Sequence, residues 1–394
     1  MRLVLFTGKG GVGKTTMAAA SSALIASRGQ KVLLVSTDPA HSLADALRTP
    51  LASEPVDVDA GLSVMQVDTQ ARFEQSWAVL RRYLVDLLGR GGVGAMAAEE
   101  LTVLPGAQEM LALIAVRDQA ASGRWDAVVV DCAPTAETLR LLALPRALQW
   151  YLERILPTHR RLARGLGPLL GGAALPGDGV VEAVSRLHAE LLGVQALLDH
   201  PETTVRLVLT AEAVVLAEAR RTATSLALFG HRLDAVIVNR LIPGGGDAWR
   251  EAWASAQAVQ LAEVAASFPD VPVRRAGYRP AEPIGLPALT EIGAELYRGA
   301  DPLAAAPVGD PFDVRRTPDE AGERFELTIP LPHAEREAVD LSRSGDELVL
   351  TVGGYRRLLA LPSVLRRCRV AGADLADGRL RVVFRPDPDL WPVG

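Results

Sequence analysis

The chain has 394 residues, of which 49% are apolar and 23% are charged. These values are ordinary for a soluble globular protein, and they exclude disordered, collagen-like and coiled-coil architectures. The formal net charge of -5 gives no overall attraction to nucleic acid or to an anionic membrane surface, so nucleic acid is not expected as a partner. No apolar run reaches the roughly 18 residues of a membrane span, and the first residues lack the features of a signal peptide, so we expect a cytoplasmic protein.

The first 240 residues alternate short apolar runs with helical patterns. Val, Leu and Ile dominate the strand-length runs, whereas residues 14–27 place Ala and Leu at helical spacing. The runs cover residues 3–7, 31–37, 62–68, 125–131, 204–210 and 233–239. This alternation predicts an α/β fold with a mostly parallel sheet that helices cover on both faces.

Two insertions interrupt this alternation, at residues 69–122 and 145–200. Each contains helical patterns in succession without an intervening strand, so we expect both to build one helical subdomain within a domain of residues 1–300. The second insertion carries an apolar stripe at helical spacing, formed by Val180, Val184, Leu187, Leu191 and Leu198. Packing against neighbouring helices is the usual role of such a stripe, and a surface that binds client proteins is the alternative.

The composition changes near residue 300. Residues 299–311 are rich in Pro, Ala and Gly, which predicts a linker that we assign to residues 301–311. Beyond it the apolar period becomes two, as in Phe325, Leu327 and Ile329. Several such short runs separated by turn residues predict a small all-β sandwich over residues 312–394.

A glycine-rich segment between the first predicted strand and the first predicted helix matches the pattern G-x-x-x-x-G-K-[ST]. Glycines leave no side chain between the backbone N–H groups and a phosphate, and the helix N-terminus adds partial positive charge. Lys14 should reach the β- and γ-phosphates, the Thr15 hydroxyl should ligate Mg²⁺, and Thr16 should contact phosphate. The predicted nucleotide-binding residues of this loop are Gly8, Lys9, Gly10, Gly11, Val12, Gly13, Lys14, Thr15 and Thr16.

Two aspartates follow predicted strands. Asp38 comes directly after residues 31–37, and Asp131 ends residues 125–131. Either aspartate alone could cap a helix, but together they lie where ligands collect in open α/β sheets. A carboxylate at position 38 can orient or deprotonate the attacking water, and Asp131 suits binding of Mg²⁺ through water. The predicted metal site is therefore Thr15, Asp38 and Asp131, and the predicted catalytic residues are Asp38, Lys9 and Lys14.

Several segments resemble one family of dimeric ATPases. Residues 8–16 (GKGGVGKTT) resemble its deviant P-loop, in which Lys9 is an additional lysine. Residues 38–45 and 131–142 resemble the switch segments of the arsenite-pump ATPases and the tail-anchored-protein targeting ATPases. Residues 104–109 (LPGAQE) and 238–243 (VNRLIP) are also similar to family segments.

The C-terminal part carries a second resemblance. Residues 310–394 resemble the α-crystallin domain of small heat-shock proteins, through FELTIPLP, the run from Val339 to Pro362 and DGRLRVVF. The whole chain is therefore similar to the branch of targeting-type ATPases that carries this domain at its C-terminus.

The resemblance implies roles for individual residues and partners. Lys9 would reach across a two-fold interface to the nucleotide of a second subunit, so that the active protein is a homodimer. Asn239 would recognise adenine, and the loop of residues 278–284, with Pro280 and Pro283, would pack on the base. ATP hydrolysis with Mg²⁺ would open and close the dimer and so change an apolar groove that binds hydrophobic client segments, such as those of tail-anchored membrane proteins. A membrane receptor would then be a further partner.

The sequence also departs from the family pattern. The CxxC pair that holds zinc between subunits in many targeting ATPases is missing, so no zinc is expected. Cys132 and Cys368 are the only cysteines, which argues against a metalloid site built from several thiolates. Two alternatives stay open: an ATPase that drives an arsenite or anion pump, and a partition-type positional switch, although residues 385–394 offer no amphipathic basic helix.

Overall fold

A computed structural model of the chain describes residues 1–38, 42–67, 107–133, 135, 138–139, 142, 178–304, 312–320 and 322–391. For residues 107–110, 178–185 and 187 it describes the backbone alone. The predicted segments 39–41, 68–106 and 143–177 therefore lie outside the described residues, as do residues 305–311 of the predicted linker.

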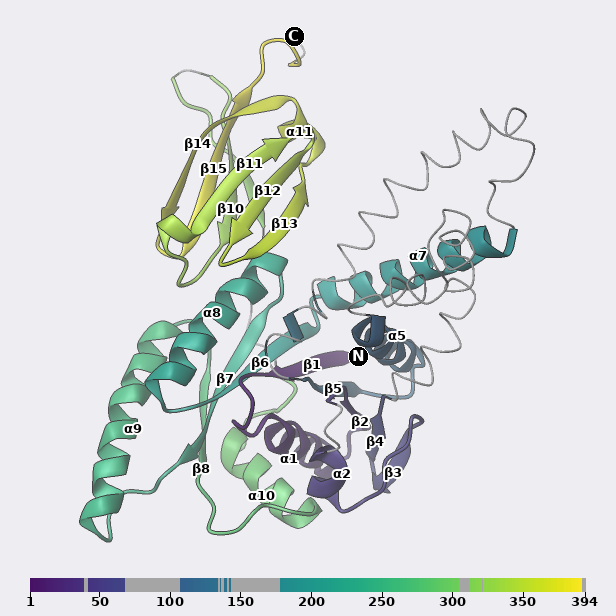
Figure 1. Cartoon of the computed structure of the whole chain (residues 1–394), viewed down its shortest axis with the longest axis vertical. Helices are drawn as coiled ribbons and strands as arrows, with labels where there is room; N and C mark the ends of the chain where they lie inside the picture. Colours follow the sequence, from purple (N-terminus) through teal and green to yellow (C-terminus); the bar gives the residue numbers. More distant parts are fainter. Residues whose placement is uncertain are drawn as a thin grey trace, which may run out of the picture.

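An eight-stranded sheet forms the first domain, with the order β3-β4-β2-β5-β1-β6-β7-β8 (Figure 1). All neighbouring pairs run parallel except β3 and β4, which confirms the predicted α/β class. The strands are β1 (Arg2–Thr7), β2 (Val32–Ser36), β3 (Val56–Asp59), β4 (Leu62–Gln66), β5 (Ala127–Asp131), β6 (Thr203–Thr210), β7 (Leu233–Leu241) and β8 (Val273–Gly277). The sequence did not predict β3 and β8, because these edge strands are only half buried and lack a continuous apolar run.

Helices cover both faces of this sheet. One apolar core lies on each face of the sheet, and alternate residues of β1 belong to different cores. Val4 and Phe6 pack towards α1 (Lys14–Ser27), α2 (Ser42–Leu47) and α10 (Leu286–Tyr297). Leu3 and Leu5 pack towards α5 (Ala107–Ala121) and α7 (Asp178–Asp199) on the other face. Side chains of successive strand residues point to opposite faces, so a strand that is buried on both sides is apolar over most of its length.

Helix α7 carries part of the predicted apolar stripe. Leu191 and Leu198 are buried in the core beneath α5, so the described part of the stripe packs inside the protein. The side chains of Val180, Val184 and Leu187 lie outside the described residues. No helix in the described part of the chain is both long enough and apolar enough to span a bilayer.

A buried ion pair network joins the amino ends of the central strands. The carboxylate of Asp234 on β7 accepts hydrogen bonds from Arg206 on β6 at 3.0 Å and from Arg2 on β1 at 2.7 Å. Arg206 also donates to the Tyr297 hydroxyl on α10 at 2.6 Å and to the carbonyl of Pro302 at 2.8 Å. The network therefore fixes the first residues after α10 against the sheet. Burial of such charges is tolerated because each one is paired.

The C-terminal region forms an antiparallel β-sandwich, as the period-two pattern predicts. One sheet has the order β14-β15-β10-β9 and the other the order β11-β12-β13. Phe325, Leu327 and Ile329 point into the core between them. The strands are β9 (Asp313–Arg316), β10 (Phe325–Pro330), β11 (Val339–Ser344), β12 (Glu347–Val352), β13 (Tyr355–Ala360), β14 (Cys368–Ala376) and β15 (Arg379–Pro386), with the short helices η1 (Arg336–Ala338) and α11 (Ser363–Arg366).

The sandwich rests on the end of helix α8 (Ala213–Phe229), which packs on β6 and β7 beside α9 (Ala248–Ser267) (Figure 1). Leu228 of α8 belongs to the core of the sandwich. The buried Arg357 of β13 donates to the Leu228 carbonyl and lies 4.3 Å from the ring centroid of Phe312. Phe229 and Tyr355 form an edge-to-face pair with centroids 6.1 Å apart. The two domains therefore share a desolvated contact in which a guanidinium satisfies a carbonyl group that the helix end leaves open.

We predict that Arg357→Met loosens this contact. The substitution removes a charged donor and leaves the Leu228 carbonyl without it, which should cost about 2–4 kcal/mol. Thermal unfolding should show a lower midpoint, and limited proteolysis should cut faster between the domains. Arg356→Met is the matched control, because Arg356 is exposed on the same strand. Equal stability of the two variants would contradict the structural role of Arg357.

Candidate nucleotide-binding site

The glycine-rich loop joins β1 to α1 at the carboxyl edge of the sheet. Gly8, Gly11 and Gly13 have φ angles of 151°, 81° and 95°, which residues with a Cβ rarely adopt. A Cβ on Gly8 would collide with the backbone carbonyl of Val208, so the loop lies directly against β6. Helix α1 begins at Lys14 without a side-chain cap. Its first N–H groups are therefore available to an anion.

The predicted phosphate and metal contacts lie together at the start of α1. The Lys14 side chain is buried, and its Nζ lies 3.4 Å from the carbonyl oxygen of Lys9. The Thr15 hydroxyl lies 3.1 Å from the hydroxyl of Ser42, the first residue of α2. Thr16 is half buried in the same helical turn, whereas Gly10 and Gly11 are exposed and Val12 is buried.

Asp131 ends β5 between β1 and β2, and its side chain is fully buried. Among the described residues, neither of its carboxylate oxygens has a hydrogen-bond partner. Burial, with a smaller effect of the Asp38 carboxylate, raises the pKa of Asp131 to about 7, although the Thr15 hydroxyl and the Lys14 ammonium lower it in part. A buried carboxylate without donors, beside a threonine hydroxyl, fits a site that a cation completes. These residues therefore fit Mg²⁺ bound together with a nucleotide.

Asp38 follows β2 and lies close enough to Asp131 to affect its pKa. The backbone N–H and the hydroxyl of Thr37 both donate to the carbonyl of Asp131, at 3.0 and 3.3 Å. The side-chain amide of Gln66 on β4 donates to the Asp38 carbonyl at 3.1 Å. The backbone of Asp38 and the preceding Thr37 are thus tied to two neighbouring strands, and the structure brings both predicted aspartates to one place.

Asn239 lies near the end of β7, where it contacts the glycine-rich loop. Its side-chain amide donates to the Val12 carbonyl at 2.9 Å, and its carbonyl oxygen accepts from the N–H of Arg240 at 2.8 Å. A Cβ on Gly13 would collide with this amide. The structure therefore shows Asn239 as a support of the loop, and adenine recognition by this residue stays a prediction.

The loop after β8 is anchored at both ends. The N–H of Tyr278 donates to the Leu241 carbonyl at 2.7 Å, and the N–H of Gly285 donates to the Ala46 carbonyl of α2 at 2.8 Å. Arg279 pairs with Glu291 of α10 at 2.9 Å. Between these anchors Pro280 is exposed and Pro283 is half buried. Their predicted contact with the base remains a prediction.

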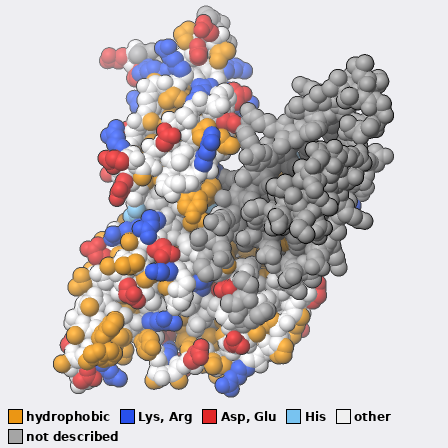
Figure 2. Space-filling model, in the orientation of Figure 1, with side chains coloured by type: hydrophobic (Ala, Val, Ile, Leu, Met, Phe, Trp, Pro, Cys, Tyr) orange, Lys and Arg blue, Asp and Glu red, His pale blue; other side chains and the backbone are white. Residues whose placement is uncertain are grey.

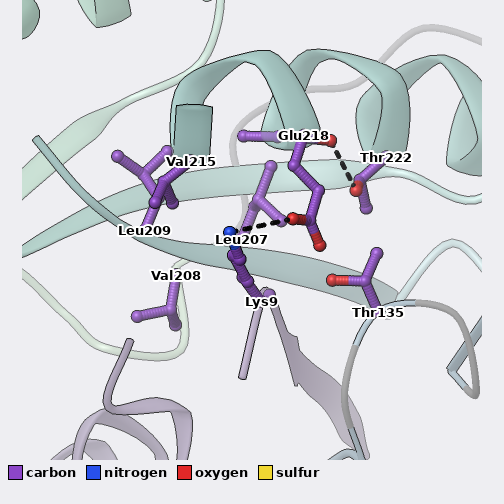
Figure 3. A pocket seen from close by; sticks show the side chains of 10 residues that line it. Lys9, Thr135, Leu207, Val208, Leu209, Val215, Glu218 and Thr222 are labelled. Carbon is purple, nitrogen blue, oxygen red and sulfur yellow. Dashed lines mark hydrogen bonds and ion pairs between the residues drawn. The ribbon is translucent and has the colours of Figure 1, made fainter. Parts of the chain in front are cut away.

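Lys9 has a partner that the sequence did not indicate. Its Nζ points away from the start of α1 and lies 3.8 Å from the carboxylate of Glu218 on α8 (Figure 3). The two side chains border a pocket between the glycine-rich loop, β6 and α8, to which Thr135 and Thr222 also contribute. Only the tertiary structure brings residue 218 to this loop, because no motif in the sequence includes it.

The two cysteines lie in separate cores. Cys132 is buried beneath the sheet next to Asp131, and Cys368 is buried in the sandwich. Burial raises the pKa of the Cys132 thiol well above its ordinary value, and the neighbouring Asp131 carboxylate raises it further. A thiol in such surroundings is a poor nucleophile and a poor metal ligand.

The raised pKa of Asp131 predicts a pH-dependent loss of stability without nucleotide and Mg²⁺. The folded protein holds the carboxyl proton of Asp131 more tightly than the unfolded chain does. The resulting contribution to the free energy of unfolding is therefore complete below about pH 4 and is lost as the pH rises through about 7. Relative to Asp131→Asn, the wild type should lose at most about 4 kcal/mol over this range. Unfolding midpoints at several pH values check this, with the exposed Asp45→Asn as control. Parallel pH profiles for wild type and Asp131→Asn would contradict it.

Comparison with known proteins adds the family. The sequence model of the anion-transporting ATPases matches residues 1–298, and that of the HSP20-like domain found in ArsA matches residues 322–384. A putative arsenical pump-driving ATPase of Chlorobaculum tepidum is 31% identical over 98% of this chain and 96% of its own length. Protein Rv2184c of Mycobacterium tuberculosis is 38% identical over 99% of this chain and 97% of its own length. The ATPase GET3 of Paracoccidioides lutzii is 31% identical over 63% of this chain and 75% of its own length.

The family matches cover the two structural domains separately. The first match contains the glycine-rich loop, both aspartates and Asn239, and the second lies within the β-sandwich. The chain therefore belongs to the ArsA family of anion-transporting ATPases, as a P-loop ATP hydrolase with an HSP20-like C-terminal domain.

Proposed function

We propose that this protein is a Mg²⁺-dependent cytoplasmic ATPase that works as a homodimer, in which ATP binding and hydrolysis close and open a groove for apolar client segments. The position of Lys9 carries the proposal. Lys14 occupies the start of α1, whereas the Lys9 side chain is 42% exposed and points towards α8. A lysine side chain that points away from its own phosphate loop can contact the nucleotide bound by a second subunit. Proteins of this family are typically dimeric, which supports this assignment.

The chain supplies the remaining groups for phosphoryl transfer to water. The N–H groups of the glycine-rich loop and Lys14 would hold the phosphates, and Thr15 and Asp131 would hold Mg²⁺. The metal ion would neutralise charge on the β- and γ-phosphates when it is bound. Asp38 would orient the attacking water or take its proton. Lys9 of the second subunit would add positive charge where the transition state develops negative charge, so hydrolysis would need a closed dimer.

The proposal also includes a groove that binds apolar client segments. We place its groove in the helical insertions, most of which lie outside the described residues. The chain is similar to the ATPase GET3 of Paracoccidioides lutzii, and the resemblance of residues 38–45 and 131–142 to switch segments of the tail-anchored-protein targeting ATPases supports a targeting or chaperone role. A membrane receptor would be a further partner.

An ATPase that drives an anion pump is the second candidate. The family description and the names of several relatives favour it. The chain has only two cysteines, which are buried in different domains and so cannot form one thiolate site. Stimulation of ATP hydrolysis by arsenite would favour the pump and count against the client model.

Asp38→Asn should trap the closed dimer. The variant keeps the phosphate loop but cannot activate water, so turnover should fall about 10²- to 10⁴-fold while ATP stays bound. Light scattering after gel filtration with Mg·ATP should show a dimer, and mass spectrometry of material purified with it should identify apolar segments. Lys14→Ala is the control that loses nucleotide affinity. Unchanged turnover in Asp38→Asn would assign water activation elsewhere, and a monomer with bound ATP would overturn the dimer.

Two inactive variants should restore activity when they are mixed. In a mixed dimer the Lys9→Ala subunit keeps Asp38 and receives Lys9 from an Asp38→Asn subunit, so one of its two sites is complete. An equal mixture that exchanges freely should reach about a quarter of wild-type turnover, because half of its dimers are mixed. Steady-state ATPase assays after incubation check this. A mixture as inactive as its components would show that Lys9 acts within its own subunit.

A further inference from the structure

Glu218 and Lys9 form a contact between α8 and the phosphate loop of the same subunit. The Lys9 Nζ and the nearer carboxylate oxygen are 3.8 Å apart, and the side chains are 42% and 30% exposed (Figure 3). The distance is at the long end for an ion pair, and both groups still contact solvent. Exposed pairs of this kind contribute little stability, so the contact can be broken and remade readily.

The backbone of Glu218 is held in place by the packing of α8. The neighbouring side chains of Val215 and Ala219 are buried in the core of the first domain. At the far end of α8, Thr224 donates to the Pro332 carbonyl of the sandwich and Arg357 donates to the Leu228 carbonyl. Helix α8 is thus fixed along its length, and a change of partner must come from the flexible Lys9 side chain.

One ammonium group cannot serve two subunits at once. In the proposed dimer the Lys9 Nζ must lie at the phosphates of the second subunit, whereas in the single chain it lies beside Glu218. We propose that Glu218 is a positioning residue that holds Lys9 in its own subunit, and that closure of the ATP-bound dimer exchanges Glu218 for the phosphates of the second subunit. This inference rests on the proposed function. It adds a restraint within each subunit that opposes closure until the second subunit presents a triphosphate.

Loss of the Lys9–Glu218 ion pair on closure weakens the dimer by an amount that can be calculated. An exposed ion pair corresponds to a factor of about 1.4 to 5 in an equilibrium constant. Closure breaks one such pair in each subunit, so the two factors multiply. Removing the Glu218 charge should therefore tighten the dimer formed with a non-hydrolysable ATP analogue by about 2- to 30-fold.

The test is Glu218→Gln in the full-length chain, which keeps the shape of the side chain and removes its charge. Sedimentation velocity with Mg²⁺ and the analogue should give a dimer dissociation constant about 2- to 30-fold below that of the wild type. The affinity of the monomer for the analogue should stay the same. The difference between variant and wild type should shrink as salt is added, because salt screens exposed charges and would not affect a packing role. Glu218→Ala must change the constant in the same direction.

Glu263→Gln is the matched control. Glu263 on α9 pairs with Arg220 of α8 at 3.1 Å, and both side chains are exposed. Its loss removes a comparable surface pair without touching Lys9, so the dimer constant should not change. A Glu218→Gln dimer as weak as the wild type, or weaker, would overturn the role of Glu218 and leave the proposed function standing. A wild type that stays monomeric with the analogue would instead overturn the dimer itself, and the Glu218 role with it.

Discussion

The parallel pairing of β1 with β5 on one side and β6 on the other is the constraint on which the rest of this structure depends. Parallel strands end at the same edge of a sheet, so this pairing brings the glycine-rich loop beside Asp131 and against Val208. The same strands are buried on both faces, so apolar residues fill most of β1 and β5, and the buried charges of Arg2 and Arg206 are paired with Asp234. Packing of the core and placement of the nucleotide site are therefore two results of one strand order.

This edge is electrostatically incomplete without a ligand. The buried Asp131 carboxylate has no hydrogen-bond donor among the described residues, and burial raises its pKa. The start of α1, next to it, has N–H groups that no side chain caps. A negative group without donors and a helix end without acceptors lie side by side, and a metal-bound triphosphate has the charges to satisfy both. A ligand that binds this site in the folded protein and not in the unfolded chain would stabilise the fold.

Helix α8 connects regions that are far apart in the sequence. One end carries Glu218 beside Lys9, and the other end is held by the β-sandwich through Arg357 and Thr224. The sandwich is therefore packed firmly on the first domain, because Leu228 of α8 belongs to the core of the sandwich and Tyr355 packs against Phe229. Helix α8 thus contacts both the sandwich and the pocket beside the phosphate loop.

The sequence by itself determined the α/β class, the sandwich and the glycine-rich loop, because each depends on a short-range pattern. Continuous apolar runs predict buried parallel strands, period-two runs predict half-buried antiparallel ones, and the spacing from Gly8 to Thr15 is local. The edge strands β3 and β8 escaped prediction because they have only 4 and 5 residues, which form neither a continuous apolar run nor a sustained period of two.

Tertiary structure alone decided several contacts between residues that are far apart in the sequence. The pairing of Lys9 with Glu218, the support of Val12 by Asn239 and the contact of Arg357 with Leu228 each join residues more than 100 positions apart. No periodicity or motif encodes such pairs, since they follow from strand order and from the helix on which the sandwich rests. The burial that raises the pKa of Asp131 is decided in the same way, because it depends on what the fold packs around one strand end.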